Sequence, residues 1–506
     1  MIDTTFHPTG PGTGVLGRTG VGGGRLGAAA RAGAVLAATL LFCWMALWNG
    51  QPFLHPDSPS YVRGAETAVT TLFGDRFATE WTAPASSTAS GAAPGATADG
   101  EVGGGRSIAY GLLAWLGAVA GGFWLTVLVQ ALAAAVLLEA VLRALGRGGL
   151  IPYAAVAALL AFATPLPFFT GFVMPDIWAG LAIGALAALF AFPDRLTRGD
   201  GLRLGSLIVF AALAHNSVVL ILLALTAAGG SIAFVRGSRG PRPWAGLLAG
   251  AMAVAAALAA ALVFNTAVER TTGRAPVMPP FLTARVIADG PGLRYVRERC
   301  GEAEFEVCLY ADKLPLPVDA FLWSPTRGVF SNASPESRRE LSAEQTRFAL
   351  AVFSAYPAEQ IAASARNAAA QLVRADLEDF EYLPPFMADM TPRVAEPHRS
   401  RFQSVRAIDA GLPLAALERI YAAAALLCLI GAAVLLSRRP AGEVRPEAAL
   451  FFALVAVGLL ANAAVCGALS ALHGRYQARV LWLLPLAFAA LAATAGSLAG
   501  RKAVAP

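Results

Sequence analysis

The chain is poor in charged residues: Asp, Glu, Lys and Arg together make up 14% of its 506 residues, whereas 56% are hydrophobic. Soluble globular chains carry roughly 25% charged residues, so this deficit predicts that lipid is the main solvent of the protein. The formal net charge of +6 is modest, and the basic residues stand in small clusters between apolar runs. Such clusters are typical of the ends of membrane spans, and they argue against a nucleic-acid partner.

Cysteine is also scarce. The chain has five, and none stands in a CxxC or Cys/His spacing that would predict a zinc site. Cys43, Cys428 and Cys466 fall in apolar runs, where a thiol usually serves as a small hydrophobic group. Cys300 and Cys308 stand close together in "CGEAEFEVC". In an oxidising compartment they would form a disulfide that closes a small hairpin, and free thiols are the alternative.

Apolar runs and basic clusters together predict about ten membrane spans. A helix needs about 20 apolar residues to cross the hydrocarbon core, and cytoplasmic connections tend to carry Lys and Arg. With every basic cluster placed inside, both termini are cytoplasmic, and "IAYGLLAWLGAVAG" is an interfacial helix. The expected spans are 34–48, 123–142, two between Arg147 and Arg195, two between Arg203 and Arg236, 246–264, 417–436, 450–469 and 480–498.

The predicted fold class is an all-α polytopic membrane protein with an extracytoplasmic, mainly helical soluble domain. The expected parts are a disordered cytoplasmic tail at 1–30 and a transmembrane module at 31–265, whose large first external loop spans 50–107. An extracytoplasmic domain at 266–415 and C-terminal transmembrane helices at 416–506 follow. We expect the protein in a bacterial inner (plasma) membrane, with its active face on the periplasmic side.

This topology gathers polar side chains at the outer face. Ionisable groups at the ends of spans are costly unless they face water or one another, so they are candidates for a functional site. The inner connections carry mainly arginines, which topology already explains. The outer residues are His55, Asp57, Asp176, His215, His398, His473 and Arg475.

Two acidic residues each have a structural explanation beside the functional one. In "HPDSPSYVRGAE", Ser58 suits a helix N-cap and Pro59 the first helical position, so Asp57 could merely favour the helix dipole. Asp176 follows a proline at the start of a span, where an acid is favoured for the same reason. A carboxylate in either place could also act on a substrate.

Basic and imidazole groups give further candidates. Arg475 and Arg479 in "HGRYQARVLW" depart from the positive-inside rule, and paired guanidiniums suit a phosphate. A plain polar turn is the ordinary explanation for His215. His55 and Asp57 could bind a divalent metal if His398 and His473 approach them, but their spacing defines no ligand set.

The serial order of these features resembles the GT-C class of membrane glycosyltransferases. In that class the first span leads into an outer loop with an acid near its start, as at Asp57. An Arg, a Tyr and a Gln follow in the order of "RSIAYGLLAWLGAVAGGFWLTVLVQ", which holds Arg106, Tyr110 and Gln130. "TPLPFFTGFVMPDIWAG" then resembles the family's next hairpin with Asp176 in the acid's place, and "GRYQARVLWLLPLAF" resembles its final span.

The chain also departs from the family pattern. Many members carry two adjacent acids at the first site, whereas Ser58 follows Asp57 here. "AHNS" stands where the family's short-span hairpin has a basic residue, and the 266–415 region resembles nothing in the class. The resemblance covers roughly the first 265 residues well and the last 40 in outline.

The resemblance implies transfer of a sugar from a polyprenyl-phosphate-linked donor to an extracytoplasmic acceptor, which is a lipid, a glycan or a protein. Asp57 is then the catalytic base, and Asp176 orients the acceptor or holds a metal. No cofactor is implied beyond this optional divalent metal, and membrane lipids are further partners. The resemblance implies that Arg475, Arg479 and Tyr476 hold the phosphate. The full set of candidate substrate-binding residues is His55, Tyr61, Arg106, His215, His473, Arg475, Tyr476 and Arg479.

Two other function classes fit the composition. A transporter or flippase of lipid-linked glycans would carry internal repeats and charges near the midplane, but the sequence shows no repeat and places its polar residues at one face. A non-catalytic membrane assembly protein would work through its external domain and would tolerate loss of Asp57 and Asp176. An enzyme would not.

Overall fold

The computed structural model describes residues 27–81, 102–236, 244–301, 305–438 and 445–495. Within these ranges the regular elements are all helices, and strand-like pairing is limited to three isolated bridges. The all-α prediction is therefore confirmed for the described residues. Most of the predicted N-terminal tail lies outside them, as does the low-complexity part of the first external loop (82–101).

Seven helical segments are long and apolar enough to cross a membrane. They identify the chain as an integral membrane protein, and they coincide with seven of the ten expected spans. They are α1 with α2 (Ala28–Phe42 and Trp44–Asn49), α5 (Trp124–Ala144), α10 (Asn216–Val235), α11 (Ala245–Thr272), α19 (Leu414–Arg438), α20 (Pro446–Leu469), and α21 with α22 (Arg475–Leu481 and Leu483–Ala495).

Three shorter helices occupy the places of the other expected spans: α6 (Leu150–Phe162), α8 (Ile177–Ala191) and α9 (Arg198–Ala214). Every residue of α8 is buried, as expected for a helix that is apolar on all sides. Gly180 lets α8 approach α21 closely, because a Cβ there would lie 2.7 Å from Trp482 Nε1 and 3.0 Å from the Arg479 carbonyl oxygen.

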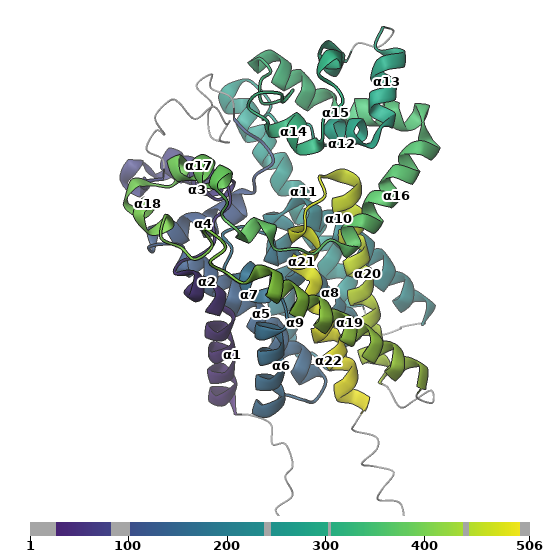
Figure 1. The fold of residues 1–506 in the computed structure, drawn as a ribbon. Coiled ribbons are helices and arrows are strands. Elements are labelled where there is room, and N and C mark those ends of the chain that lie inside the picture. Colours follow the sequence, from purple (N-terminus) through teal and green to yellow (C-terminus); the bar gives the residue numbers. More distant parts are fainter. Residues whose placement is uncertain (1–26, 82–101, 237–243, 302–304, 439–444, 496–506) are drawn as a thin grey trace, which may run out of the picture.

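The remaining helices gather at one end of the long ones (Figure 1). We call this the head end, and the opposite end, where α1 begins and α22 ends, the tail end. The expected interfacial helix is α4 (Ile108–Val119), which lies at the head end beside α3 (Ser58–Phe73). Short elements complete the N-terminal half: η1 (Asp75–Phe77) and α7 (Leu166–Thr170).

The region expected as one external domain divides between two hydrophobic cores. Residues 281–356 have a core of their own, centred on Phe321, Leu341 and Phe348. It is built from α12 (Phe281–Asp289), α13 (Pro291–Arg299), η3 (Glu306–Lys313), α14 (Val318–Trp323) and α15 (Pro335–Ala355). Cys300 and Cys308 form a disulfide within it, with their Cα atoms 5.6 Å apart.

The rest of that region packs on the membrane helices. α16 (Pro357–Val373) runs from the separate core down to α20 (Figure 1). Beyond α16, Phe380, Tyr382 and Phe402 belong to the same core as the spanning helices. This stretch contains η4 (Glu378–Phe380), α17 (Pro384–Met390), η5 (Thr391–Arg393) and α18 (Glu396–Phe402).

Candidate functional site

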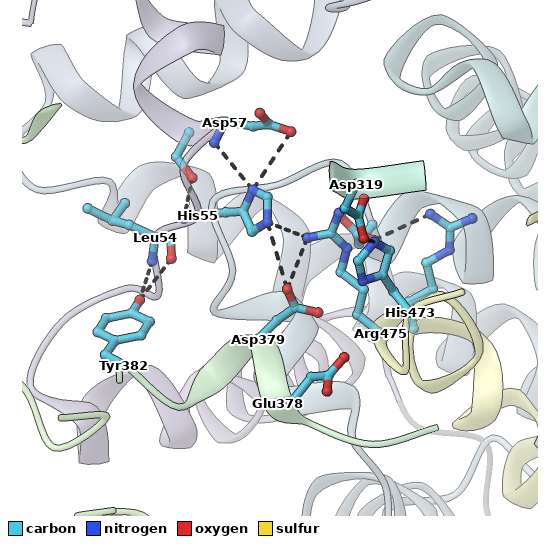
Figure 2. A network of polar contacts seen from close by, with 12 residues as sticks. Leu54, His55, Asp57, Asp319, Glu378, Asp379, Tyr382, His473 and Arg475 are labelled. Atoms are coloured by element: carbon cyan, nitrogen blue, oxygen red, sulfur yellow. Dashed lines mark hydrogen bonds and ion pairs between the residues drawn. The ribbon is translucent and has the colours of Figure 1, made fainter. Parts of the chain in front are cut away.

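The "HPDSPSY" stretch connects α2 to α3 and is fixed by the segment before α8. The Phe53 amide donates to the Gly171 carbonyl, and the Val173 amide donates to the Phe53 carbonyl, both at 2.9 Å. On the other side, the Tyr382 hydroxyl accepts from the Leu54 amide at 2.7 Å and donates to the Leu54 carbonyl at 2.9 Å (Figure 2). The backbone that carries His55 is therefore held by two distant parts of the chain.

The expectation that Ser58 caps α3 is wrong. The helix begins at Ser58, so Asp57 stands at the N-cap position, where its side chain makes no capping hydrogen bond to the described residues. The Ser58 hydroxyl donates to the Val173 carbonyl at 2.8 Å and accepts from the His55 amide at 2.9 Å. The bond from the His55 amide closes the turn, and the bond to the Val173 carbonyl connects the turn to the segment before α8.

Asp57 pairs with Arg106, which lies just before α4. The Arg106 guanidinium also lies over the Tyr61 ring, 5.8 Å from its centroid. The Asp57 side chain is 23% exposed, so its carboxylate stays within reach of solvent. Tyr61 packs edge-on against Tyr110 at 5.1 Å, which connects α3 to α4 behind the ion pair.

His55 lies between Asp57 and Arg475 (Figure 2). Arg475 donates from Nη1 to His55 Nε2 at 2.5 Å and lies 3.3 Å from Asp379 Oδ1. A guanidinium has only donors, so Nε2 accepts in this contact, while the Asp57 amide donates toward Nδ1 at 3.3 Å and Asp57 Oδ2 lies 3.7 Å from Nδ1. Both ring nitrogens therefore face an N–H donor, and a neutral imidazole accepts at only one of them. Burial and the Arg475 charge hold the pKa of His55 well below its usual value, so the imidazole is neutral at pH 7.

Asp176 and Arg479 form the most buried ion pair of the site. Their atoms are 3.3 Å apart, and the side chains are 1% and 0% exposed. Arg479 Nη2 also donates to Ser217 Oγ at 3.1 Å and to Asn462 Oδ1 at 3.0 Å. Burial alone would raise the pKa of Asp176, but the charges of Arg475 and Arg479 outweigh it and hold the pKa below its usual value.

The structure brings the predicted site residues into one connected set. Tyr476 joins the two halves, because its ring centroid lies 5.2 Å from the guanidinium carbons of both Arg475 and Arg479. His215 joins through Ser217 Oγ, 2.8 Å from its Nδ1, and His473 through its ring contact with Tyr476 at 5.3 Å. We call this set the polar cluster: His55, Asp57, Tyr61, Arg106, Asp176, His215, Asp379, His473, Arg475, Tyr476 and Arg479.

Asp379 is a member that sequence reasoning missed, and Asp319 lies at the edge of the cluster, 3.4 Å from His473 Nε2. Both residues come from the region after α11, where no motif singled them out. With Asp379, the three arginines of the cluster (Arg106, Arg475 and Arg479) face three aspartates (Asp57, Asp379 and Asp176), so the charges of the cluster balance.

Among the described residues, the buried Nε atoms of Arg106, Arg475 and Arg479 have no hydrogen-bond partner, so each guanidinium keeps an unused donor.

The structure does not support the metal option. His398 lies away from His55, stacked on Trp81 at 5.7 Å and 3.5 Å from Glu80 Oε2. In the part of the chain that the structure describes, no three His, Cys, Asp or Glu side chains gather as a ligand set. Each of the three cluster aspartates is instead paired with an arginine, so the carboxylates do not converge on one point as a cation site requires.

The loop before Arg475 is held by side chains from the region after α11. Gln371 donates from Nε2 to the His473 carbonyl at 2.8 Å and accepts from the His473 amide at 3.2 Å. Arg374 donates to the Leu472 carbonyl at 3.0 Å, and Arg285 donates to the Ser470 carbonyl at 3.2 Å. These bonds fix the position from which Arg475 enters the cluster.

Replacing Gln371 by alanine is expected to loosen this loop. Two hydrogen bonds to the His473 peptide are lost, each worth about 1 kcal/mol, so amide exchange there should accelerate roughly tenfold or more. Hydrogen–deuterium exchange of the 470–478 peptide measures this. Gln360→Ala is the matched control, because Gln360 lies on the same helix but binds Asp289 and Ser364. Equal exchange in the two variants would show that Gln371 does not hold the loop.

The chain was compared with protein-family models, with curated proteins and with solved structures. None of the three comparisons finds a match. What the protein does must therefore be inferred from its own residues and from how the fold brings them together.

Proposed function

We propose that the chain is a GT-C-like membrane glycosyltransferase that moves a sugar from a polyprenyl-phosphate-linked donor to an extracytoplasmic acceptor. One observation carries the proposal: Asp57, Asp176 and Arg475, from distant parts of the sequence, converge in one polar cluster at the head end. The resemblance in serial order points to the same residues.

The proposed topology has about ten spans, with α6, α8 and α9 as short crossings beside the seven longer ones. Both termini would be cytoplasmic in a bacterial inner membrane, and the head end would face the periplasm. Two observations support this orientation: α1 begins and α22 ends at the same end of the bundle (Figure 1), and the basic clusters of the connections fall on that side in the ten-span assignment.

Asp57 is the proposed base. It takes the proton of the acceptor hydroxyl as the acceptor oxygen bonds to the sugar's anomeric carbon, and the bond from that carbon to the phosphate oxygen breaks. Its exposure supports this role, because Asp176 is 1% exposed and cannot meet an acceptor without a rearrangement. His55 lies beside it, with Nδ1 3.7 Å from Asp57 Oδ2 and 3.3 Å from the Asp57 amide, and so helps to hold the turn that carries the carboxylate.

The leaving group is a polyprenyl phosphate, whose growing negative charge needs donors. Arg106 and Arg475 fit this part, because Arg106 pairs with Asp57, Arg475 reaches Asp57 through His55, and their side chains are 24% and 10% exposed. Arg479 is fully buried against Asp176, so we assign this pair to positioning and not to the direct phosphate contact that the sequence suggested. The polyprenyl tail would lie between the spanning helices.

The experiment is a donor-cleavage assay with the full chain in lipid nanodiscs. A polyprenyl-phosphate-linked sugar is supplied with a cell-envelope extract as acceptor, and free polyprenyl phosphate is measured. Release that depends on the protein and on the acceptor supports the transferase. In sealed vesicles, movement of intact donor between leaflets without cleavage would instead indicate a flippase. If neither release nor movement is observed, an assembly protein is favoured.

A further inference from the structure

A pocket lies at the tail end of the bundle, between the last turns of α8 and α10 and the first turn of α20. α8 and α10 both begin beside the polar cluster, so the pocket lies at the opposite ends of these helices from the cluster. It has room of about 190 Å³, which is more than ten times the roughly 10–15 Å³ that one water requires. The pocket is therefore large enough for a small ligand.

The buried part of its lining is apolar. Phe192 is fully buried, and Phe190, Ala233 and Leu450 are at most 9% exposed. An apolar cavity of about 150 Å³ holds a benzene molecule, so these side chains leave space for the apolar part of a ligand. α10 and α20 are long and apolar enough to cross a membrane, so their ends place the pocket at the level of lipid headgroups.

The exposed part of the lining is charged, and its charges balance. It carries two arginines and two acids, Arg195, Arg236, Asp194 and Glu447. Arg195 and Glu447 are 3.0 Å apart, which joins the segment after α8 to α20. Arg236 is exposed, and its side chain makes no hydrogen bond or ion pair to the described residues. A ligand at this rim meets both a guanidinium and carboxylates.

A headgroup with one charge of each sign matches this lining better than an anionic one. Guanidinium groups suit a phosphate, so Arg236 favours a phosphate in the ligand. An anionic headgroup would also face Asp194 and Glu447 with no cation of its own to offset them. The C-terminal ends of α8 and α10 add the negative poles of two helix dipoles and carbonyls that accept hydrogen bonds. These acceptors favour an ammonium that carries N–H groups.

We propose that this pocket binds a phospholipid whose headgroup carries a primary ammonium, such as phosphatidylethanolamine. The phosphate lies against Arg236, and the ammonium donates to Asp194, Glu447 and the last carbonyls of α8 and α10. The glycerol and the first carbons of one acyl chain enter the apolar part, and the rest of the lipid lies in the bilayer. The proposal does not depend on the transferase activity.

The test measures binding of dihexanoyl phosphatidylethanolamine to the full chain in a neutral detergent by isothermal titration calorimetry. We expect saturable binding that weakens about tenfold or more in Arg236→Ala, which removes the contact to the phosphate. Ala233→Phe, which fills the apolar part with a ring, should weaken binding at least as much. Arg236 is exposed, so its replacement tests the site even if the larger side chain at 233 lowers stability.

Each variant has a matched control outside the pocket. Arg198→Ala removes an exposed arginine shortly after Arg195, and Ala227→Phe adds a ring to the exposed face of α10. Both controls should bind the lipid as the wild type does. Wild-type affinity in both pocket variants, or no saturable binding by the wild type, would overturn the site itself.

Three comparison probes decide the chemistry of the ligand. Dihexanoyl phosphatidylglycerol has no ammonium, and the methylated ammonium of dihexanoyl phosphatidylcholine has no N–H, so each should bind at least tenfold more weakly. Equal binding of either lipid would overturn the assignment of a primary ammonium. Free phosphoethanolamine should not compete at millimolar concentration, and full competition by it would assign the pocket to a soluble molecule instead of a lipid.

Discussion

Replacing Asp57 by asparagine should lower sugar transfer by about 100- to 10,000-fold, the range that a general base contributes. The amide keeps the size of the side chain but cannot take the acceptor's proton. Donor binding should change less, because Arg475 and Arg106 remain in place. Initial rates of polyprenyl phosphate release, measured at several donor concentrations, separate the loss of kcat from any change in KM.

Asp75→Asn is the control for this variant. Asp75 is an exposed acid on η1 at the same end of the molecule and lies outside the polar cluster, so its loss should leave the rate unchanged. Because Asp57 also pairs with Arg106, both variants must show wild-type melting before rates are compared. A rate for Asp57→Asn within twofold of the wild type would remove Asp57 as the base.

Replacing Arg479 by leucine should cost about 3–5 kcal/mol of stability, because it leaves the Asp176 carboxylate charged and buried without its partner. Ser217 and Asn462 would lose the same donor. The midpoint of denaturant unfolding in detergent measures the effect. Replacing Asp176 and Arg479 together by leucine should recover much of the loss, since no lone charge is then buried.

Arg195→Leu provides the comparison for an exposed ion pair. Arg195 and Glu447 are 3.0 Å apart, but their side chains are 39% and 36% exposed, so this pair is worth at most about 1 kcal/mol. If Arg479→Leu is no more damaging than Arg195→Leu, the buried pair does not hold the site together, and its positioning role is lost.

Much of the helical architecture could be predicted because hydrophobicity and charge act locally along the chain. Seven expected spans coincide with long apolar helices, and α4 occupies the place of the interfacial helix. The polar cluster could also be predicted, because ionisable groups at the ends of spans must meet one another or water. Asp57, Asp176 and Arg475 follow from that rule without knowledge of their partners.

The partners themselves could not be predicted. His55 meets Arg475 across 420 residues, and Asp176 meets Arg479 across 303. Asp379 enters the cluster because η4 packs on the spanning helices, which no local pattern indicates. Ser58 does not cap α3 for a related reason: its hydroxyl accepts from the His55 amide, which precedes the helix, and donates to the Val173 carbonyl of the distant segment before α8.

The central claim is that the polar cluster receives the phosphate of a lipid-linked donor, and binding of a short isoprenyl phosphate to the full chain tests it without knowledge of sugar or acceptor. We predict saturable binding that weakens at least tenfold in Arg475→Ala, as loss of a charge-assisted contact implies. The Arg294→Ala variant should bind as the wild type does, because Arg294 is an exposed residue of α13, in the region 281–356 that has its own core. Undiminished binding by a folded Arg475→Ala variant, or no binding by the wild type, would contradict the claim.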